Sequence, residues 1–97
     1  MNKRFVVLIE NETDETYAAL KAIVQGKYGW WHWIKGSWLI TSSSQETTAS
    51  SLRDEVRTAT AGRNTVVLQI AEGGTWAGFG PQKPPKDMFS WIKRNWK

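Results

Sequence analysis

Residues 28–40, YGWWHWIKGSWLI, hold four tryptophans in thirteen positions. Lys35-Gly36 interrupts the apolar run, and glycine readily adopts the positive φ that a two-residue hairpin turn requires. Side chains of a strand alternate between its two faces. A regular hairpin therefore gives one face Trp31, Trp33, Trp38 and Ile40, and the other face Trp30, His32, Ile34 and Leu39. Neither set is polar, which predicts two strands of a sheet that is covered on both sides.

The rest of the chain surrounds this hairpin with strand and helix patterns. Residues 4–10, RFVVLIE, and 64–71, NTVVLQIA, are rich in β-branched side chains and predict strands. Residues 14–25 carry apolar side chains at helical spacing, and a weaker helical pattern runs from Ser44 to Gly62. The order β-α-β-β-α-β predicts an α+β, ferredoxin-like fold, in which a four-stranded antiparallel sheet carries two helices on one face.

The composition changes after residue 72. The segment EGGTWAGFGPQKPPK contains all three prolines of the chain and predicts an irregular loop. It is followed by DMFSWIKRNWK, in which Asp87 can cap a short amphipathic helix. We expect residues 1–72 to form the ferredoxin-like domain. Residues 73–97 then form a tail that either belongs to the same domain or is exchanged within a dimer.

The formal net charge of +4 is concentrated in this tail. Acidic and basic side chains balance over residues 1–82, whereas residues 83–97 contain one acid, Asp87, and five cations: Lys83, Lys86, Lys93, Arg94 and Lys97. A concentrated basic patch attracts polyanions, although a lysine-rich tail can also serve only solubility. Two aromatic side chains near these cations offer flat faces on which bases stack. The candidate ligand-binding residues are therefore Trp76, Phe79, Lys83, Lys86, Lys93 and Arg94.

The two apolar faces of the sheet also predict self-association. Two helices cover one face only, so the tail, a second subunit or a ligand must cover the other. Burying about 800 Å² on each partner is ordinary for a homodimer. We expect a homodimer or a larger homo-oligomer whose interface contains Val6, Leu8, Val67, Trp30, His32 and Leu39. A bulge at Trp30-Trp31 would exchange the faces of the hairpin, and both would still be apolar.

Three segments together resemble a known group of proteins. YGWWHWIKGSWLI, TWAGFG and FSWIKRNW resemble the small bacterial proteins of the SinR family, which are similar in fold and size to the ferredoxin-like nuclease subunit of CRISPR adaptation. The resemblance implies a ferredoxin-like homodimer whose tail crosses or extends the sheet. In the CRISPR relatives, an aspartate at the end of the first strand binds a divalent metal across the dimer. Here Glu10 stands near that position, and its longer side chain would displace the ion.

These observations leave several functions open. We expect a non-catalytic homodimer that binds nucleic acid or a nucleotide and needs no cofactor. One alternative, implied by the resemblance, is a ribonuclease or deoxyribonuclease that uses paired Glu10 residues and Mg²⁺ or Mn²⁺. Others are an oligomer that sequesters a small (cyclic) nucleotide signal in phage counter-defence, and a protein-interaction module. His32 has no metal-ligating neighbour in the sequence, so we expect a hydrogen-bonded core histidine.

The chain contains no cysteine, which excludes disulfides and thiolate metal sites. The short apolar run near Met1 meets acidic residues at once and lacks the length of a signal sequence, and no stretch approaches the length of a membrane span. We therefore expect a cytoplasmic protein with no membrane partner.

Overall fold

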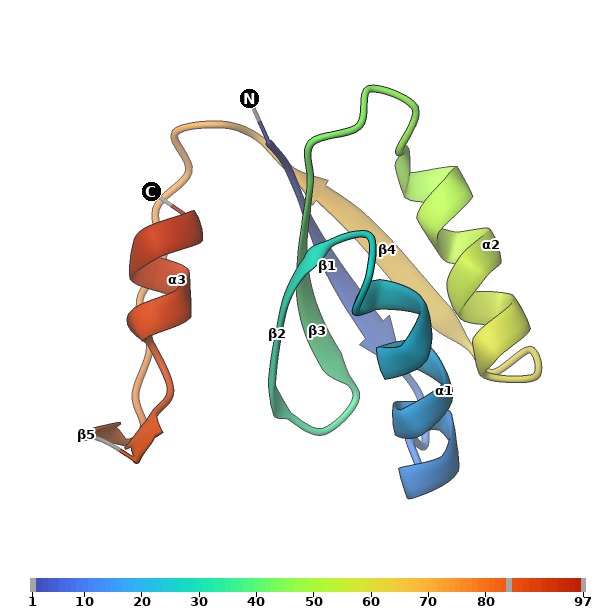
Figure 1. Cartoon of the computed structure of the whole chain (residues 1–97), viewed down its shortest axis with the longest axis horizontal. Coiled ribbons are helices and arrows are strands. Elements are labelled where there is room, and N and C mark those ends of the chain that lie inside the picture. Colours follow the sequence, from blue (N-terminus) through green and yellow to red (C-terminus); the bar gives the residue numbers. More distant parts are fainter. Residues whose placement is uncertain (1, 84, 97) are drawn as a thin grey trace.

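The computed structural model describes residues 2–83 and 85–96. Four strands form one antiparallel sheet in the order β2-β3-β1-β4 (Figure 1). Their bounds are β1 Lys3–Ile9, β2 Gly29–Ile34, β3 Ser37–Ser42 and β4 Thr65–Ile70. Helices α1 (Asp14–Val24) and α2 (Ala49–Ala59) lie on one side of the sheet, which we call the helix face. The α+β, ferredoxin-like fold expected from the sequence is confirmed.

Both helices begin at a threonine that caps them. The Thr13 side chain accepts a hydrogen bond from the Thr16 amide, and the Thr16 side chain accepts one from the Thr13 amide, which completes a capping box. Thr48 and Ser51 form the same capping box at the start of α2. The expected start of the second helix at Ser44 is wrong. The residues before Thr48 instead form a loop that is held by its own hydroxyl groups, since Ser42 Oγ lies 2.8 Å from Thr47 Oγ1 and accepts a hydrogen bond from the Ser44 amide.

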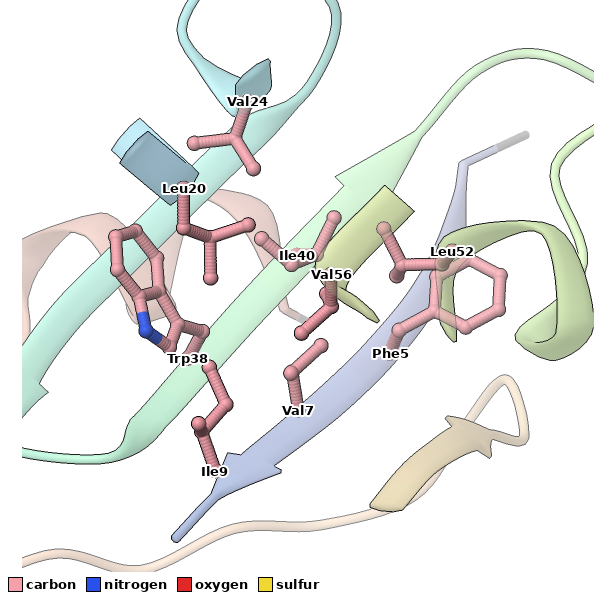
Figure 2. Close-up of a cluster of buried hydrophobic side chains, with 9 residues drawn as sticks. All are labelled: Phe5, Val7, Ile9, Leu20, Val24, Trp38, Ile40, Leu52 and Val56. Atoms are coloured by element: carbon pink, nitrogen blue, oxygen red, sulfur yellow. The ribbon is translucent and has the colours of Figure 1, made fainter. Parts of the chain in front are cut away.

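The main hydrophobic core lies between the helix face and the two helices. Nine buried side chains fill it (Figure 2): Phe5, Val7, Ile9, Leu20, Val24, Trp38, Ile40, Leu52 and Val56. Every second residue of β1 points into this core, as the alternation of a strand requires. The intervening residues of β1 belong to the opposite face, which is also apolar.

The hairpin of β2 and β3 turns at Lys35-Gly36, as the sequence predicts, but its pairing is irregular. Trp31 pairs with Leu39, whereas Ile34 pairs with Ser37. The two residues of β2 between these pairs therefore oppose a single residue of β3, which is the arrangement of a β-bulge. The extra residue lies after Trp31, closer to the turn than the bulge considered at Trp30-Trp31.

The bulge decides which tryptophans share a face. Trp30 and His32 lie on the helix face with Trp38, at ring-centroid distances of 5.5 Å and 4.2 Å from it. Trp31 lies on the opposite face and is buried there. The regular hairpin had placed Trp31 with Trp38, so this expectation is wrong, because one inserted residue reverses the faces of everything before it in the strand.

The tail packs against the face opposite the helices, which we call the tail face (Figure 1). Strands β5 (Gln82–Lys83) and β6 (Lys86–Asp87) form a small hairpin, and α3 (Ser90–Asn95) follows it. A second core forms there from Trp31, Met88, Phe89, Ile92 and Trp96. Lys97, counted among the tail cations, lies outside the described residues. In the described part of the chain, no helix has the length and apolar character needed to cross a membrane.

Candidate nucleic-acid interface

The tail is attached to the sheet near both of its ends. The indole Nε1 of Trp31 donates a buried hydrogen bond of 2.7 Å to the carbonyl oxygen of Met88. The second attachment is at Arg4, near the start of β1. Its Nη2 donates to the carbonyl oxygen of Ala71 at 3.1 Å, and its guanidinium carbon lies 5.8 Å from the centre of the Trp96 ring. Arg4 therefore connects Ala71, the residue that follows β4, with Trp96, the residue that follows α3.

The tail cations lie on the surface of the molecule. Lys83, Lys86, Lys93 and Arg94 are all exposed. Lys83 and Lys86 are directly opposed across the β5–β6 hairpin, where two like charges repel each other. Asp87 does not neutralise them by an ion pair; its Oδ1 accepts hydrogen bonds of 3.2 Å from two backbone amides at the start of α3. The N-cap of α3 is Phe89, which makes no side-chain cap hydrogen bond, so the expectation that Asp87 is the cap residue is wrong. Asp87 lies two residues earlier and holds the entry to the helix through these two amides.

The loop between β4 and β5 is fastened to the start of α3. The Trp76 ring stacks on the buried Phe89 ring with a centroid distance of 5.7 Å. A Cβ atom on Gly78 would lie 2.4 Å from the Phe89 ring, and one on Gly80 would lie 2.5 Å from Met88 Sδ. These glycines therefore allow the loop backbone to lie directly on the second core.

Phe79 stands between the two fastened glycines and points outward. Its side chain is 99% exposed, whereas Trp76 is 37% exposed because one side of its ring faces Phe89. The sequence suggested both aromatics as stacking residues. The structure gives them different surroundings: Trp76 fixes the loop, and Phe79 has no intramolecular partner surface in the described part of the chain.

Glu10 lies at the end of β1, exposed to solvent. Its Oε2 accepts a hydrogen bond of 2.5 Å from Nδ2 of Asn64. Glu10 lines an open depression together with residues of β1, β4 and the β2–β3 turn, among them Leu8, Lys35 and Val66. Among the described residues, no three His, Asp or Glu side chains gather into a group that could hold a metal ion. The use of Glu10 in a metal site shared by two subunits stays a prediction.

The acid that does form a buried site is Glu12. Its carboxylate accepts hydrogen bonds from Nε2 of His32 at 2.7 Å and from Nε1 of Trp38 at 2.8 Å. The backbone amide of Gly36 donates to it as well, at 3.2 Å. The other ring nitrogen of His32, Nδ1, lies 2.8 Å from the carbonyl oxygen of Ser37, which can only accept. His32 is thus a hydrogen-bonded core histidine, as expected.

Sequence reasoning missed the role of Glu12. The only signal is that a lone histidine within an apolar strand needs acceptors for its ring nitrogens. The partner is twenty positions away, and only the fold brings it to the hairpin turn. His32 is also enclosed by aromatic rings: it stacks on Trp38 with an interplanar angle of 2° and lies 5.2 Å from Tyr17. The hydrogen-bonded pair of Glu12 and His32 therefore connects the β1–α1 loop with the hairpin.

The expected dimer interface divides between the two faces of the sheet. The helix face holds Trp30, His32 and Val67, and the tail face holds Val6, Leu8 and Leu39. Assigning the first three to a face free for a partner is wrong. The bulge explains the two hairpin residues, and Val67 lies directly opposite Val7, whose side chain is in the main core.

The tail covers only part of its face. The second core contacts Val6, Leu39 and Ile70, but four neighbouring side chains remain between 42% and 53% exposed: Leu8, Ile34, Val66 and Leu68. We call these four residues the apolar strip. They are contiguous, because Leu8 pairs with Val66 and only Ser37 separates Leu8 from Ile34.

Comparisons of this chain with protein-family models, with curated proteins and with solved structures find no match. The resemblance to the SinR family and to the CRISPR adaptation nuclease therefore stays a prediction that rests on the three sequence segments alone.

Proposed function

We propose that this chain is a non-catalytic nucleic-acid-binding protein and that its tail is the contact surface. The observation that carries the proposal is the opposed pair Lys83 and Lys86, exposed and directly across from each other on a two-strand hairpin. Such a pair is unfavourable in the free protein, and a phosphate backbone beside it offsets the repulsion. Lys93 and Arg94 extend the same charge into α3, where they also suit the carboxyl end of a helix.

The salt dependence of binding tests this proposal. Four phosphate contacts give a slope of about −3 to −4 in a plot of log affinity against log salt concentration. We expect labelled oligonucleotides to bind with such a slope and Lys83→Glu to weaken binding strongly. Lys35→Glu, which makes the same change in net charge at an exposed position outside the tail, is the matched control. A flat salt response, or an equal loss in both variants, would refute the tail as the contact surface.

We further propose that the protein is a homodimer and that the apolar strip forms its interface. Single exposed aliphatic side chains are ordinary, but a contiguous apolar patch on a sheet is typical of an association site. The tail lies on the sheet of its own chain, and an exchange of tails between two copies would keep the same contacts. A dimer presents two basic tails, which raises the avidity for a polymer that reaches both.

Light scattering during size-exclusion chromatography tests the dimer. We expect the wild-type protein to have twice the mass of one chain at micromolar concentration and Leu8→Glu to have the mass of one. Phe79→Glu places the same charge on an exposed apolar position outside the strip, so it should leave the mass unchanged. A wild-type monomer at tens of micromolar would contradict the interface and would leave the tail proposal intact.

A further inference from the structure

Phe79 is fully exposed for a reason that lies in the loop on either side of it. The backbone lies so close to the second core that a Cβ atom would clash with the Phe89 ring at Gly78 and with the sulfur of Met88 at Gly80. One residue later, the carbonyl oxygen of Pro81 accepts a hydrogen bond of 2.9 Å from the Met88 amide. Both neighbours of Phe79 are thus fixed on the second core, and the ring is directed away from it.

The second core does not need the Phe79 ring. Trp76 already covers the outer side of Phe89. A phenyl ring that stays in water forfeits the stabilisation that burial would bring, and loops usually fold such a ring back onto the protein. Here the residues on both sides of Phe79 lie close against the second core, and the ring itself stays in water. The ring is therefore available to a ligand, and it is held in a defined place before the ligand arrives.

We propose that Phe79 stacks on an unpaired base of a single-stranded nucleic acid. This inference rests on the proposed function, and it names the ligand class of the same surface. The charge of the tail favours a polyanion, and a nucleic acid offers a flat base beside each of its phosphates. In a duplex the bases already stack on each other, whereas a single strand offers their faces to an aromatic side chain.

An anionic membrane also attracts cations beside an exposed aromatic ring. The tail fits this partner less well, because the apolar side of α3 is buried against the sheet through Ile92 and Trp96. Phe79 is then the one large apolar side chain of the described tail that is fully exposed. A surface helix that binds membranes needs a whole apolar face. Lipid vesicles therefore serve as one arm of the test.

Fluorescence anisotropy with three labelled ligands of about 12 nucleotides tests the inference. The ligands are a single strand, the matching duplex, and an abasic strand that keeps the phosphates and lacks the bases. We expect the single strand to bind more tightly than the other two. We expect Phe79→Ala to weaken its binding about 5- to 150-fold, which is the loss of one base-stacking contact, and to leave binding of the abasic strand unchanged.

Two further variants make the result specific to stacking. Phe79→Trp keeps an aromatic face and should restore tight binding, whereas Phe79→Leu keeps an apolar side chain and should not. All three substitutions lie at a fully exposed position, so the thermal midpoint should stay within a few degrees of wild type and show that each variant folds.

The outcomes separate the two proposals. If no ligand binds at low salt, the proposed function itself fails. If all three ligands bind alike and Phe79→Ala changes nothing, the basic tail stands and the stacking role is overturned. Binding of vesicles of phosphatidylserine and phosphatidylcholine that is lost in Phe79→Ala, without preference for the single strand, would overturn it in favour of a membrane. A retained small nucleotide in native mass spectrometry that blocks the strand would also overturn it.

Discussion

Substitution of Glu12 by glutamine is the sharpest test of the buried site. The carboxylate accepts three hydrogen bonds, from His32, Trp38 and the Gly36 amide. Glutamine has one acceptor oxygen, and its amide group would face at least one of these donors in either orientation. That donor then stays buried without a partner, which costs about 1–3 kcal/mol. Removing one partner of a buried pair costs about 3–5 kcal/mol when its charge is left unpaired.

We therefore expect Glu12→Gln to lower the free energy of unfolding by about 2–4 kcal/mol, which lowers the thermal midpoint by roughly 10–25 °C in a domain of this size. Urea denaturation and calorimetry measure both quantities. Glu10→Gln is the matched control: the same change two residues earlier, at an exposed carboxylate whose one side-chain partner among the described residues is Asn64. We expect it to change stability by less than about 0.5 kcal/mol.

Equal effects of the two substitutions would refute this reasoning, because they would mean that burial and the three donors contribute nothing at Glu12. A double-mutant cycle with His32→Gln provides an independent check. Residues in one hydrogen-bond network couple by about 0.5–3 kcal/mol. A coupling energy of zero would also contradict the geometry.

Two further predictions concern single side chains. Burial, together with the hydrogen bond to Glu55 and the charge of Glu55, raises the pKa of Tyr28 from 10.0 to about 12. Because the folded state holds this proton more tightly, its contribution to stability is complete below pH 10 and is lost as the pH rises to about 12. Absorbance titration should show Tyr28 ionising late, and Glu55→Gln should lower its pKa. Gly36→Ala should lower the free energy of unfolding, measured by urea denaturation, by about 2 kcal/mol, because φ is +80° there and a Cβ would lie 2.7 Å from the Ile9 carbonyl oxygen. Gly26→Ala, which meets no atom within 4 Å, should cost nothing.

The order of elements could be predicted from the sequence because each signal is local. The turn at Lys35-Gly36 needs only a glycine that tolerates positive φ. The strands follow from runs of β-branched residues. The predicted start of α2 was wrong because several residues with hydroxyl groups could each cap a helix. The hydroxyl groups before Thr48 form hydrogen bonds within their own loop, so Thr48, and not an earlier residue, becomes the N-cap.

The distribution of tryptophans could not be predicted, because it depends on one inserted residue. A period of two assigns faces correctly only while the pairing stays regular, and the bulge after Trp31 breaks it. Glu12 was missed for a related reason. Its partner, His32, becomes a neighbour only when the end of β1 meets the hairpin turn. Both errors concern contacts between segments that are distant in the sequence.

The consecutive residues Trp30 and Trp31 have a thermodynamic consequence. Trp30 packs against the main core, and Trp31 belongs to the second. Strand β2 therefore contributes to both hydrophobic cores through neighbouring residues. If either core opens, an indole becomes exposed to water and the packing of β2 in the other core is weakened. Although a long loop connects the tail to β4, we expect the tail and the rest of the domain to unfold together in one calorimetric transition. The tail should not unfold at a lower temperature.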